Sequence, residues 1–475
     1  MSDEGKSPKE AKKRWPRIVL AVVVGLLVVT GLALRQPTKV ASGYSAKRLC
    51  SEVFVAGRQL EDIVREDLAL MPLPLSTHVD RDKKEASVSV LWATQTAAWR
   101  PGLGCALTTG VDLKALKAAG FEPTAAPKDL DQAPWPAGDK LPEALPEGVD
   151  RAKMDAAMDW AFEEPDPDVL RLTRAVVVLY KGQIVAERYA KGYDRHTPLL
   201  GWSMTKSVTS ALMGVLAKEG KVDIKAPAPV PQWSGDDRAK ITTDALLRMS
   251  SGLGFDETYG PFGDVTAMLF TKPDTAGFAL QSKAAAEPDK VWSYSSGTTN
   301  ILSWIIRQTL GDDAAYHRFA RRALFEPIGA WSAVMETDPS GTMVGSSFLY
   351  MNARDWARFG LLYLNDGVWQ GNRILPEGWV KYSCTPTGPA PQGEYGAQWW
   401  LNAGAPGNPQ DRMYPSLPTD VCAAQGFETQ RVMVIPSRDV VIVRLGLTQK
   451  RGAFDVDAFG AKILDALPKA AAAAP

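Results

Sequence analysis

The chain has 475 residues, enough to bury a large core, and one large domain with a smaller one is the natural expectation at this length. Lysine and arginine together number 54, and so do aspartate and glutamate, which leaves no excess of positive charge to neutralise a phosphate backbone. We therefore do not expect nucleic acid as a partner.

A basic segment and an apolar run open the chain. Residues 1–17 are rich in lysine and arginine, and residues 18–34 carry no charged side chain (IVLAVVVGLLVVTGLAL). As a helix this run nearly crosses a hydrocarbon core roughly 30 Å thick. We expect a cytoplasmic tail over 1–17 and a single transmembrane anchor over 18–35, with the rest of the chain on the periplasmic or exterior side of the inner membrane. A cleaved signal peptide is the alternative, although the run is longer than the usual apolar region of such peptides.

The next two segments differ in pattern. Residues 40–110 contain a helical stretch (EDIVREDLALM) and an alternating stretch (ASVSVLWA), which together predict a small α/β unit. Residues 122–148 are rich in proline, alanine and aspartate without apolar periodicity, as is typical of an extended linker, which we place over residues 111–150. The large domain is then expected over residues 151–470.

Strand patterns stand at both ends of this large domain. Apolar runs at 175–180 and 184–189, separated by a short turn, predict a β-hairpin. A second pair of runs at 431–435 and 440–445 repeats the pattern, and a helical segment at about 455–467 follows it. The middle is mostly helical. This order predicts an α/β (α+β) fold in which distant parts of the chain complete one sheet.

The four cysteines are even in number, in a chain expected to meet an oxidising compartment. We expect disulfides that join Cys50 to Cys105 and Cys384 to Cys422, although four cysteines allow three connectivities. The sequence contains no C-x-x-C pair, and its three histidines lie far from one another and from any cysteine. We therefore expect no metal site and no cofactor.

The sharpest chemical motif is the stretch SMTK, which runs from Ser203 to Lys206. Apolar residues after Ser203 recur at helical spacing as far as Gly220, so the serine and the lysine lie in the first turn of a helix and share one face. A lysine kept partly neutral by burial can accept the serine proton. The free N–H of Ser203 at the helix N-terminus can donate to an oxyanion. Taken alone, an S-x-x-K pattern occurs roughly once by chance in a chain of this length.

The surrounding residues resemble a known family. The stretch GWSMTK at 201–206 resembles the first motif of class C β-lactamases and their esterase and amide-hydrolase relatives, and WSYSSG at 292–297 is similar to their second, Tyr-x-Asn/Ser motif. The likeness covers about residues 153–467 and implies a β-lactamase-like fold, with a central antiparallel sheet flanked by helices. In that family a tyrosine and the lysine pass the proton from nucleophile to leaving group. The resemblance gives Tyr294 that role and makes Ser296 a positioning or substrate-binding residue.

The third motif departs from this family. β-Lactamases carry Lys-Thr-Gly and many relatives carry His-x-Gly, whereas this chain has Ala424, Gln425 and Gly426. The missing side chain helps β-lactamases to hold the substrate carboxylate, so its loss argues against β-lactam hydrolysis. The backbone N–H of Phe427 is expected to complete the oxyanion hole with that of Ser203, where one donor is worth about 3 kcal/mol. Gln425 and Gly426 are substrate-binding candidates.

The chain is closest in character to the branch that resembles 6-aminohexanoate-dimer hydrolases and family esterases. In that branch a tyrosine on a mobile loop closes over the substrate amide, and Tyr259 occupies a comparable place, although an ordinary loop tyrosine fits the sequence equally well. Tryptophans beside the motifs either line an apolar pocket or belong to the core. Trp400 is the candidate for the cleft.

These motifs predict a serine hydrolase that cleaves a small-molecule ester or amide through an acyl-enzyme on Ser203, with Lys206 and Tyr294 activating the water that releases it. Two alternatives stay open. One is a catalytically idle, penicillin-binding-like module that binds cell-wall peptides or a partner protein. The other is a true β-lactamase or cell-wall peptidase.

Overall fold

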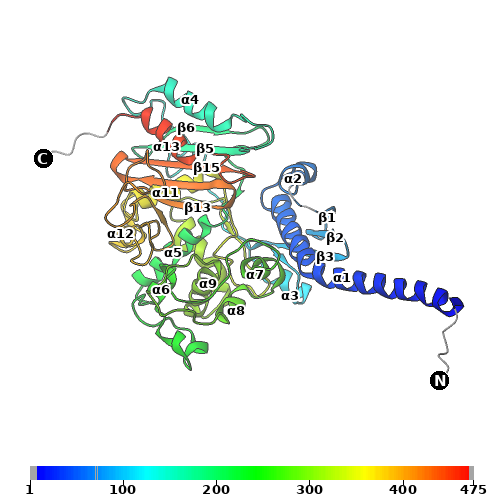
Figure 1. Ribbon diagram of the computed structural model, residues 1–475. Coiled ribbons are helices and arrows are strands. Elements are labelled where there is room, and N and C mark those ends of the chain that lie inside the picture. The colour runs from blue at the N-terminus through cyan, green and yellow to red at the C-terminus, as the bar shows by residue number, and fades with distance from the viewer. Residues whose placement is uncertain (1–7, 70, 72, 470–475) are drawn as a thin grey trace.

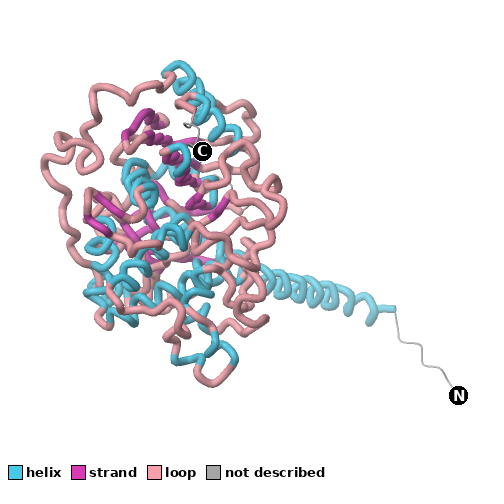
Figure 2. The backbone as a smooth tube through the Cα atoms, turned by 90° about the vertical axis from the view of Figure 1, so that its left-hand side faces the viewer, coloured by secondary structure: helices cyan, strands magenta, loops and turns pink. Residues whose placement is uncertain are grey.

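The computed structural model describes residues 8–69, 71 and 73–469, and one long helix dominates its N-terminal part (Figure 1). Helix α1 (Pro8–Phe54) projects from the folded body along its first half and packs into it along its second half (Figures 1 and 2). The stretch Val19–Phe54 is long and apolar enough to include a membrane span. The sequence pattern predicts an anchor that is separate from the small unit. In the structure one unbroken helix joins them, because Leu49 and Val53 near its end are buried in the small unit.

The small N-terminal unit is a four-stranded antiparallel sheet in the order β1-β2-β3-β4, packed against the second half of α1. The predicted helical stretch forms a helix that ends at Glu66, shorter than the pattern suggested, and the main helix of the unit is the end of α1. A disulfide between Cys50 and Cys105 joins α1 to β4. The elements are α2 (Leu60–Glu66), β1 (Leu75–Asp80), β2 (Glu85–Val90), β3 (Ala93–Arg100), β4 (Gly104–Leu107) and α3 (Leu113–Ala118).

The large domain is built on a six-stranded antiparallel sheet in the order β12-β13-β14-β15-β5-β6. As predicted, strands from the two ends of the domain pair directly, with Ile442 opposite Val178. Helices α4 and α13 cover one face of the sheet and α11 packs on the other. The elements are α4 (Arg151–Phe162), β5 (Thr173–Tyr180), β6 (Gln183–Tyr189), α11 (Ala353–Leu364), β12 (Trp400–Leu401), β13 (Cys422–Gly426), β14 (Gln430–Ile435), β15 (Val440–Gly446) and α13 (Val456–Asp465).

A mostly helical region packs beside the sheet around helix α5 (Met204–Lys218), whose first thirteen residues are all buried. The left-handed backbone of Gly220 follows its C-cap, as the sequence indicates. The other helices and helical turns of this region are η1 (Pro231–Trp233), η2 (Asp237–Lys240), α6 (Thr243–Leu247), α7 (Asp264–Thr271), α8 (Thr275–Leu280), α9 (Ser296–Leu310), α10 (Asp313–Ala320), η3 (Arg321–Phe325) and α12 (Trp379–Ser383). The short strands are β7 (Leu199–Leu200), β8 (Val334–Met335), β9 (Leu349–Met351), β10 (Val368–Trp369) and β11 (Asn372–Arg373), and two further turns are η4 (Phe427–Thr429) and η5 (Pro436–Arg438).

The segment expected to be an extended linker follows the surface of the large domain and is hydrogen-bonded to it. It begins with the short helix α3, and the rest of it consists of turns and irregular chain. The indole N–H of Trp135 donates to the carbonyl of Gly182 at 2.8 Å, and Arg358 of α11 donates to the carbonyl of Gly138 and to Asp139, each at 2.8 Å. These bonds hold the segment against the domain.

A second disulfide, between Cys384 and Cys422, ties the end of α12 to β13, the strand that carries the third motif. Both disulfides have the pairing that the sequence analysis expected.

Candidate active site

The candidate nucleophile Ser203 stands at the N-cap of α5, directly after a tight turn. Trp202 has a left-handed backbone with φ of 48°, which turns the chain sharply from β7 into the helix. A Cβ on Gly426 would lie 2.2 Å from the carbonyl oxygen of Gly201. Only glycine therefore allows the end of β13 to approach the nucleophile turn this closely.

Lys206 is buried within reach of the nucleophile, with 1% of the residue exposed. Its Nζ donates to Ser203 Oγ at 3.1 Å, to Ser296 Oγ at 3.0 Å and to the carbonyl oxygen of Ser346 at 3.0 Å. Burial lowers the pKa of Lys206 to about 8, and the charge of Glu257 opposes this shift. A substantial share of the amine is therefore neutral near physiological pH, as a general base requires.

Tyr294 lies beside this amine, as the second motif implies. The Nζ of Lys206 is 4.8 Å from the centroid of the Tyr294 ring, which packs against Tyr395 and Trp400 at centroid distances of 5.8 Å and 5.3 Å. Burial raises the pKa of Tyr294 well above its usual value, the neighbouring Tyr395 adds to this, and hydrogen bonding to Ser203 acts the other way. The phenol therefore keeps its proton at neutral pH and has one to donate.

A carboxylate that the sequence analysis did not single out completes the polar network. Ser296, the first residue of α9, donates to Glu257 through its backbone N–H at 2.7 Å and through its hydroxyl at 2.6 Å. Because Ser296 also accepts from Lys206, Glu257 fixes which way the serine hydroxyl points. In the sequence, the only indication that Glu257 takes part in the site is that it stands two residues before Tyr259.

Tyr259 comes to the same place from the loop before α7. Its hydroxyl is 3.4 Å from Glu257 Oε1, and hydrogen bonding to Ser296 and Ser203 contributes to its pKa, which burial raises overall. The residue as a whole is half exposed although its hydroxyl is desolvated, and its ring stacks on Phe427 with centroids 6.1 Å apart. The structure thus brings this loop tyrosine to the nucleophile.

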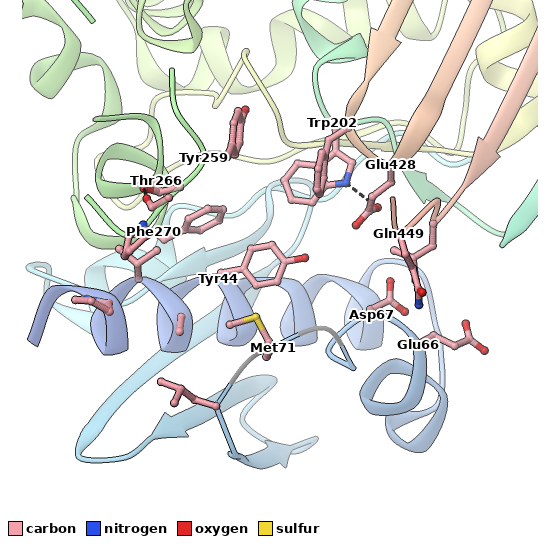
Figure 3. A pocket seen from close by; sticks show the side chains of 18 of the residues that line it. Tyr44, Glu66, Asp67, Met71, Trp202, Tyr259, Thr266, Phe270, Glu428 and Gln449 are labelled. Atoms are coloured by element: carbon pink, nitrogen blue, oxygen red, sulfur yellow. Dashed lines mark hydrogen bonds between the residues drawn. The ribbon is translucent and has the colours of Figure 1, made fainter. Parts of the chain in front are cut away.

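Phe427 follows the end of β13, where the third motif lies beside the nucleophile turn. Among the described residues, neither its N–H nor that of Ser203 donates to another protein group. The next residue, Glu428, has φ of 60° and accepts from the indole N–H of Trp202 at 2.9 Å (Figure 3). This bond ties the end of β13 to the residue before the nucleophile, and Arg48 of α1 lies 3.6 Å from the same carboxylate.

The two further candidates Trp400 and Gln425 lie in different surroundings, and Trp399, the neighbour of Trp400 in the chain, belongs to the core. Trp400 is partly buried against Tyr294, at the wall of the site. The amide of Gln425, a predicted substrate-binding group, donates to the hydroxyl of Tyr414 at 3.0 Å, so it is already engaged by a protein partner. Trp399 is fully buried against Tyr363, with centroids 4.2 Å apart, and belongs to the core. Over the described ranges no group of three or more His, Cys, Asp or Glu side chains is arranged to hold a metal ion.

Comparison with known proteins gives one family match and several similar folds. The model of the Beta-lactamase family matches residues 166–466. The 6-aminohexanoate-dimer hydrolase of Paenarthrobacter ureafaciens is 25% identical over 305 residues, which are 58% of this chain and 72% of the relative. A family VIII carboxylesterase structure has a TM-score of 0.53 at 14% identity and covers 69% of this chain and 99% of its own. The hydrolase EstCE1, described as having promiscuous acyltransferase activity, has a TM-score of 0.52 at 14% identity, over 66% and 97% of the two chains.

Proposed function

Because the chain belongs to the Beta-lactamase family and is a serine hydrolase, we propose that it cleaves a carboxylic ester or amide through an acyl-enzyme on Ser203. The observation that carries this proposal is the buried amine of Lys206, 3.1 Å from Ser203 Oγ and held by two further acceptors. A serine hydroxyl becomes nucleophilic when a positioned base accepts its proton.

In the acylation step, Lys206 Nζ accepts the proton of Ser203 while Oγ attacks the substrate carbonyl carbon. The carbonyl oxygen becomes an oxyanion, for which the N–H groups of Ser203 and Phe427 are the proposed donors. When the intermediate collapses, the bond from carbon to the leaving oxygen or nitrogen breaks. Tyr294 gives its proton to the leaving group and regains one from Lys206, so the amine returns to its neutral form.

In the deacylation step a water molecule replaces the leaving group. The base formed by Lys206 and Tyr294 accepts a water proton while the water oxygen attacks the acyl carbon. The bond from Ser203 Oγ to the acyl carbon then breaks, and the serine recovers its proton. The products are a carboxylic acid and the alcohol or amine released earlier. The bonds from Glu257 through Ser296 to Lys206 support this cycle by holding the amine in place.

The third motif favours a simple ester or amide over a β-lactam. At the position where β-lactamases carry a lysine, this chain has Ala424, and the adjacent Gln425 is held toward Tyr414. The strand therefore offers backbone donors without a cationic side chain for a substrate carboxylate. The same feature motivates the second candidate, a binding module that has lost catalysis.

Activity-based labelling of the full chain in detergent separates these candidates. We expect a fluorophosphonate probe to label the wild type, and p-nitrophenyl acetate to be hydrolysed. Ser203→Ala should abolish labelling and lower kcat at least about 10³-fold. Ser234→Ala, at an exposed position, is the control and should behave as wild type. Full activity in Ser203→Ala would refute the nucleophile, and an inert wild type would favour the binding module.

We further propose that residues 18–35 of α1 anchor the enzyme in the inner membrane, with residues 1–17 in the cytoplasm and the hydrolase facing the periplasm or exterior. The large apolar side chains described between residues 19 and 32 are exposed, among them Val19 at 48% and Leu32 at 66%. The two disulfides fit an oxidising compartment. We expect the chain to resist extraction from membranes by carbonate. We also expect protease added outside spheroplasts to digest the hydrolase domain. Release of a shortened chain into the periplasm would instead identify a cleaved signal peptide.

A further inference from the structure

A cavity of about 420 Å³ lies beside the nucleophile turn, between the catalytic region and helix α1 (Figure 3). Its volume lies within the range of roughly 300–1,000 Å³ that is common for small-molecule sites. One wall comes from Val40, Ala41 and Tyr44 of α1, which lie outside the family-matched residues. The opposite wall includes Trp202 and Phe427, the neighbours of the nucleophile and of the third motif. The N-terminal helix thus builds part of a pocket that Trp202, the residue before Ser203, also lines.

A row of aromatic rings connects this cavity with the catalytic site. The Tyr259 ring stacks on Phe427, the Phe427 ring meets Trp202 edge to face at 5.7 Å, and Trp202 lies parallel to Tyr44 of α1 at 6.3 Å. Tyr259 and Phe427, which both line the cavity, are 50% and 54% exposed, so this part of the lining also reaches solvent. Aromatic rings therefore line the cavity from Tyr259 to α1, and the lining also includes the carboxylates of Glu66, Asp67 and Glu428.

The cavity also adjoins the apolar, exposed part of α1. Pro37 contributes to its lining, and Leu32, little more than one helical turn earlier, is 66% exposed. On the catalytic side the loop before α7 carries Phe262, which is 72% exposed. An apolar chain that reaches the cavity from this end of the molecule thus meets apolar side chains on both walls.

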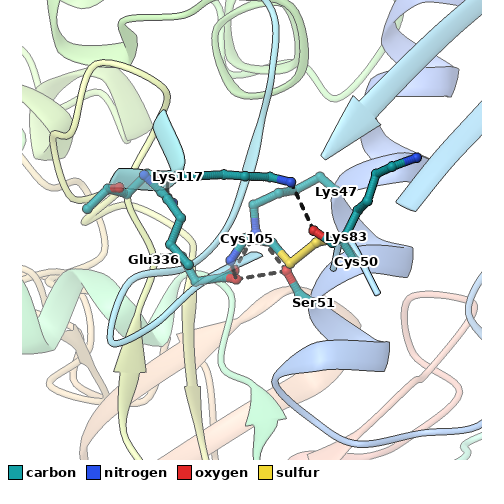
Figure 4. Close-up of a disulfide and its surroundings, with 9 residues drawn as sticks. Lys47, Cys50, Ser51, Lys83, Cys105, Lys117 and Glu336 are labelled. Atoms are coloured by element: carbon teal, nitrogen blue, oxygen red, sulfur yellow. Dashed lines mark hydrogen bonds and ion pairs between the residues drawn. A yellow bond between two sulfur atoms is a disulfide. The ribbon is translucent and has the colours of Figure 1, made fainter. Parts of the chain in front are cut away.

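The wall formed by α1 is firmly attached. A Cβ on Gly43 would lie 2.1 Å from the carbonyl oxygen of Phe270, so α1 and α7 pack backbone against backbone. Further along α1, Glu336 of the large domain accepts from Ser51 Oγ at 2.8 Å and from the N–H of Cys105 at 2.7 Å, beside the disulfide to Cys50 (Figure 4). The cavity is therefore a built feature of the fold and does not depend on a loosely docked helix.

We propose that this cavity holds the acyl chain of the substrate, so that the enzyme hydrolyses long-chain acyl esters or amides of lipid-like molecules that reach it from the bilayer. This inference rests on the proposed function, because it needs the acyl-enzyme on Ser203. The acyl carbon forms its bond to Ser203 Oγ as the bond to the alcohol or amine breaks, while the alkyl chain lies between α1 and the catalytic region. Water then releases a fatty acid.

The chain-length dependence of the full enzyme in lipid nanodiscs tests the proposal. We expect kcat/KM to rise at least about 100-fold from p-nitrophenyl acetate to the octanoate, since each buried methylene is worth roughly fourfold. Ala41→Trp fills the cavity from α1 and should lower the ratio of octanoate to acetate activity at least about tenfold. Leu20→Trp places the same side chain on an exposed position of the same helix, several turns before the cavity, and should keep the wild-type ratio.

The outcomes distinguish this inference from the proposed function. If no ester is turned over and Ser203 is not labelled, the proposed function fails and the inference fails with it. If the acetate is turned over but the chain-length profile of the wild type is flat, the inference alone is overturned. An unchanged ratio in Ala41→Trp also overturns it. Val40→Phe, a smaller addition to the same wall, replaces Ala41→Trp if that variant does not fold.

Discussion

Replacing Lys206 by methionine tests whether burial sets the protonation state of the proposed catalytic amine. The residue is 1% exposed, and burial lowers its pKa from 10.5 to about 8. Between these two pH values the unfolded chain still holds a proton that the folded chain has released, so the free energy of unfolding of the wild type rises with pH. Methionine has a similar length and no charge, and the variant should lack this rise.

The size of the effect follows from the two pKa values. Lowering the pKa of Lys206 from 10.5 to about 8 costs the folded chain roughly 3 kcal/mol wherever both states are protonated. This cost is complete below the folded pKa and disappears as the pH reaches the unfolded value. The free energy of unfolding of the wild type minus that of Lys206→Met should therefore increase by about 3 kcal/mol from neutral pH to about pH 10.5. Lost hydrogen bonds change the difference by an amount that is nearly independent of pH.

Urea unfolding followed by tryptophan fluorescence, at several pH values in one detergent, measures this difference. Lys218→Met, at the exposed end of the same helix, is the matched control, and its difference from wild type should stay flat over the same range. The wild-type kcat/KM should also rise with pH to a plateau above about 8, because only the neutral amine accepts the serine proton. A stability difference between wild type and Lys206→Met that stays constant, or falls with pH, would show that the amine is not desolvated.

Three further perturbations test neighbouring parts of the structure. Glu257→Gln removes the charge that raises the pKa of Lys206, so the rising limb of the profile of kcat/KM against pH should move to lower pH. The plateau should fall roughly 10–100-fold, because the amine is no longer held in place. A move of the rising limb to higher pH would contradict this. Asp67→Asn removes the carboxylate that the buried guanidinium groups of Arg48, Arg58 and Arg174 share. It should lower the free energy of unfolding by about 3–5 kcal/mol. A loss too small to resolve in urea titrations would mean that water reaches these guanidinium groups. Replacing both Cys50 and Cys105 by serine removes a crosslink across a sequence separation of 55. The chain-entropy model then gives a loss of about 4 kcal/mol in the free energy of unfolding. An unaltered urea midpoint would count against that disulfide.

The parts of the fold and site that follow from sequence depend on local spacing. Ser203 and Lys206 share one face because any α-helix places residues three apart side by side. Alternating or apolar runs around short turns predict two hairpins, β5 with β6 and β14 with β15. A two-stranded hairpin is barely stable alone, so both are expected to join one sheet. These features need few contacts beyond neighbouring turns and strands.

Other features depend on contacts between distant segments. Ser296 lies 39 residues from Glu257 and 90 from Lys206 along the chain, and nothing in the spacing of these residues indicates that one hydroxyl bonds to both. The sequence itself determined the candidate nucleophile, the candidate base and the strand pattern, through motifs and periodicity within short windows. The position of Glu257 and the closing of a cavity by α1 were decided only in the tertiary structure, because side-chain packing and burial set the contacts between segments remote in the chain.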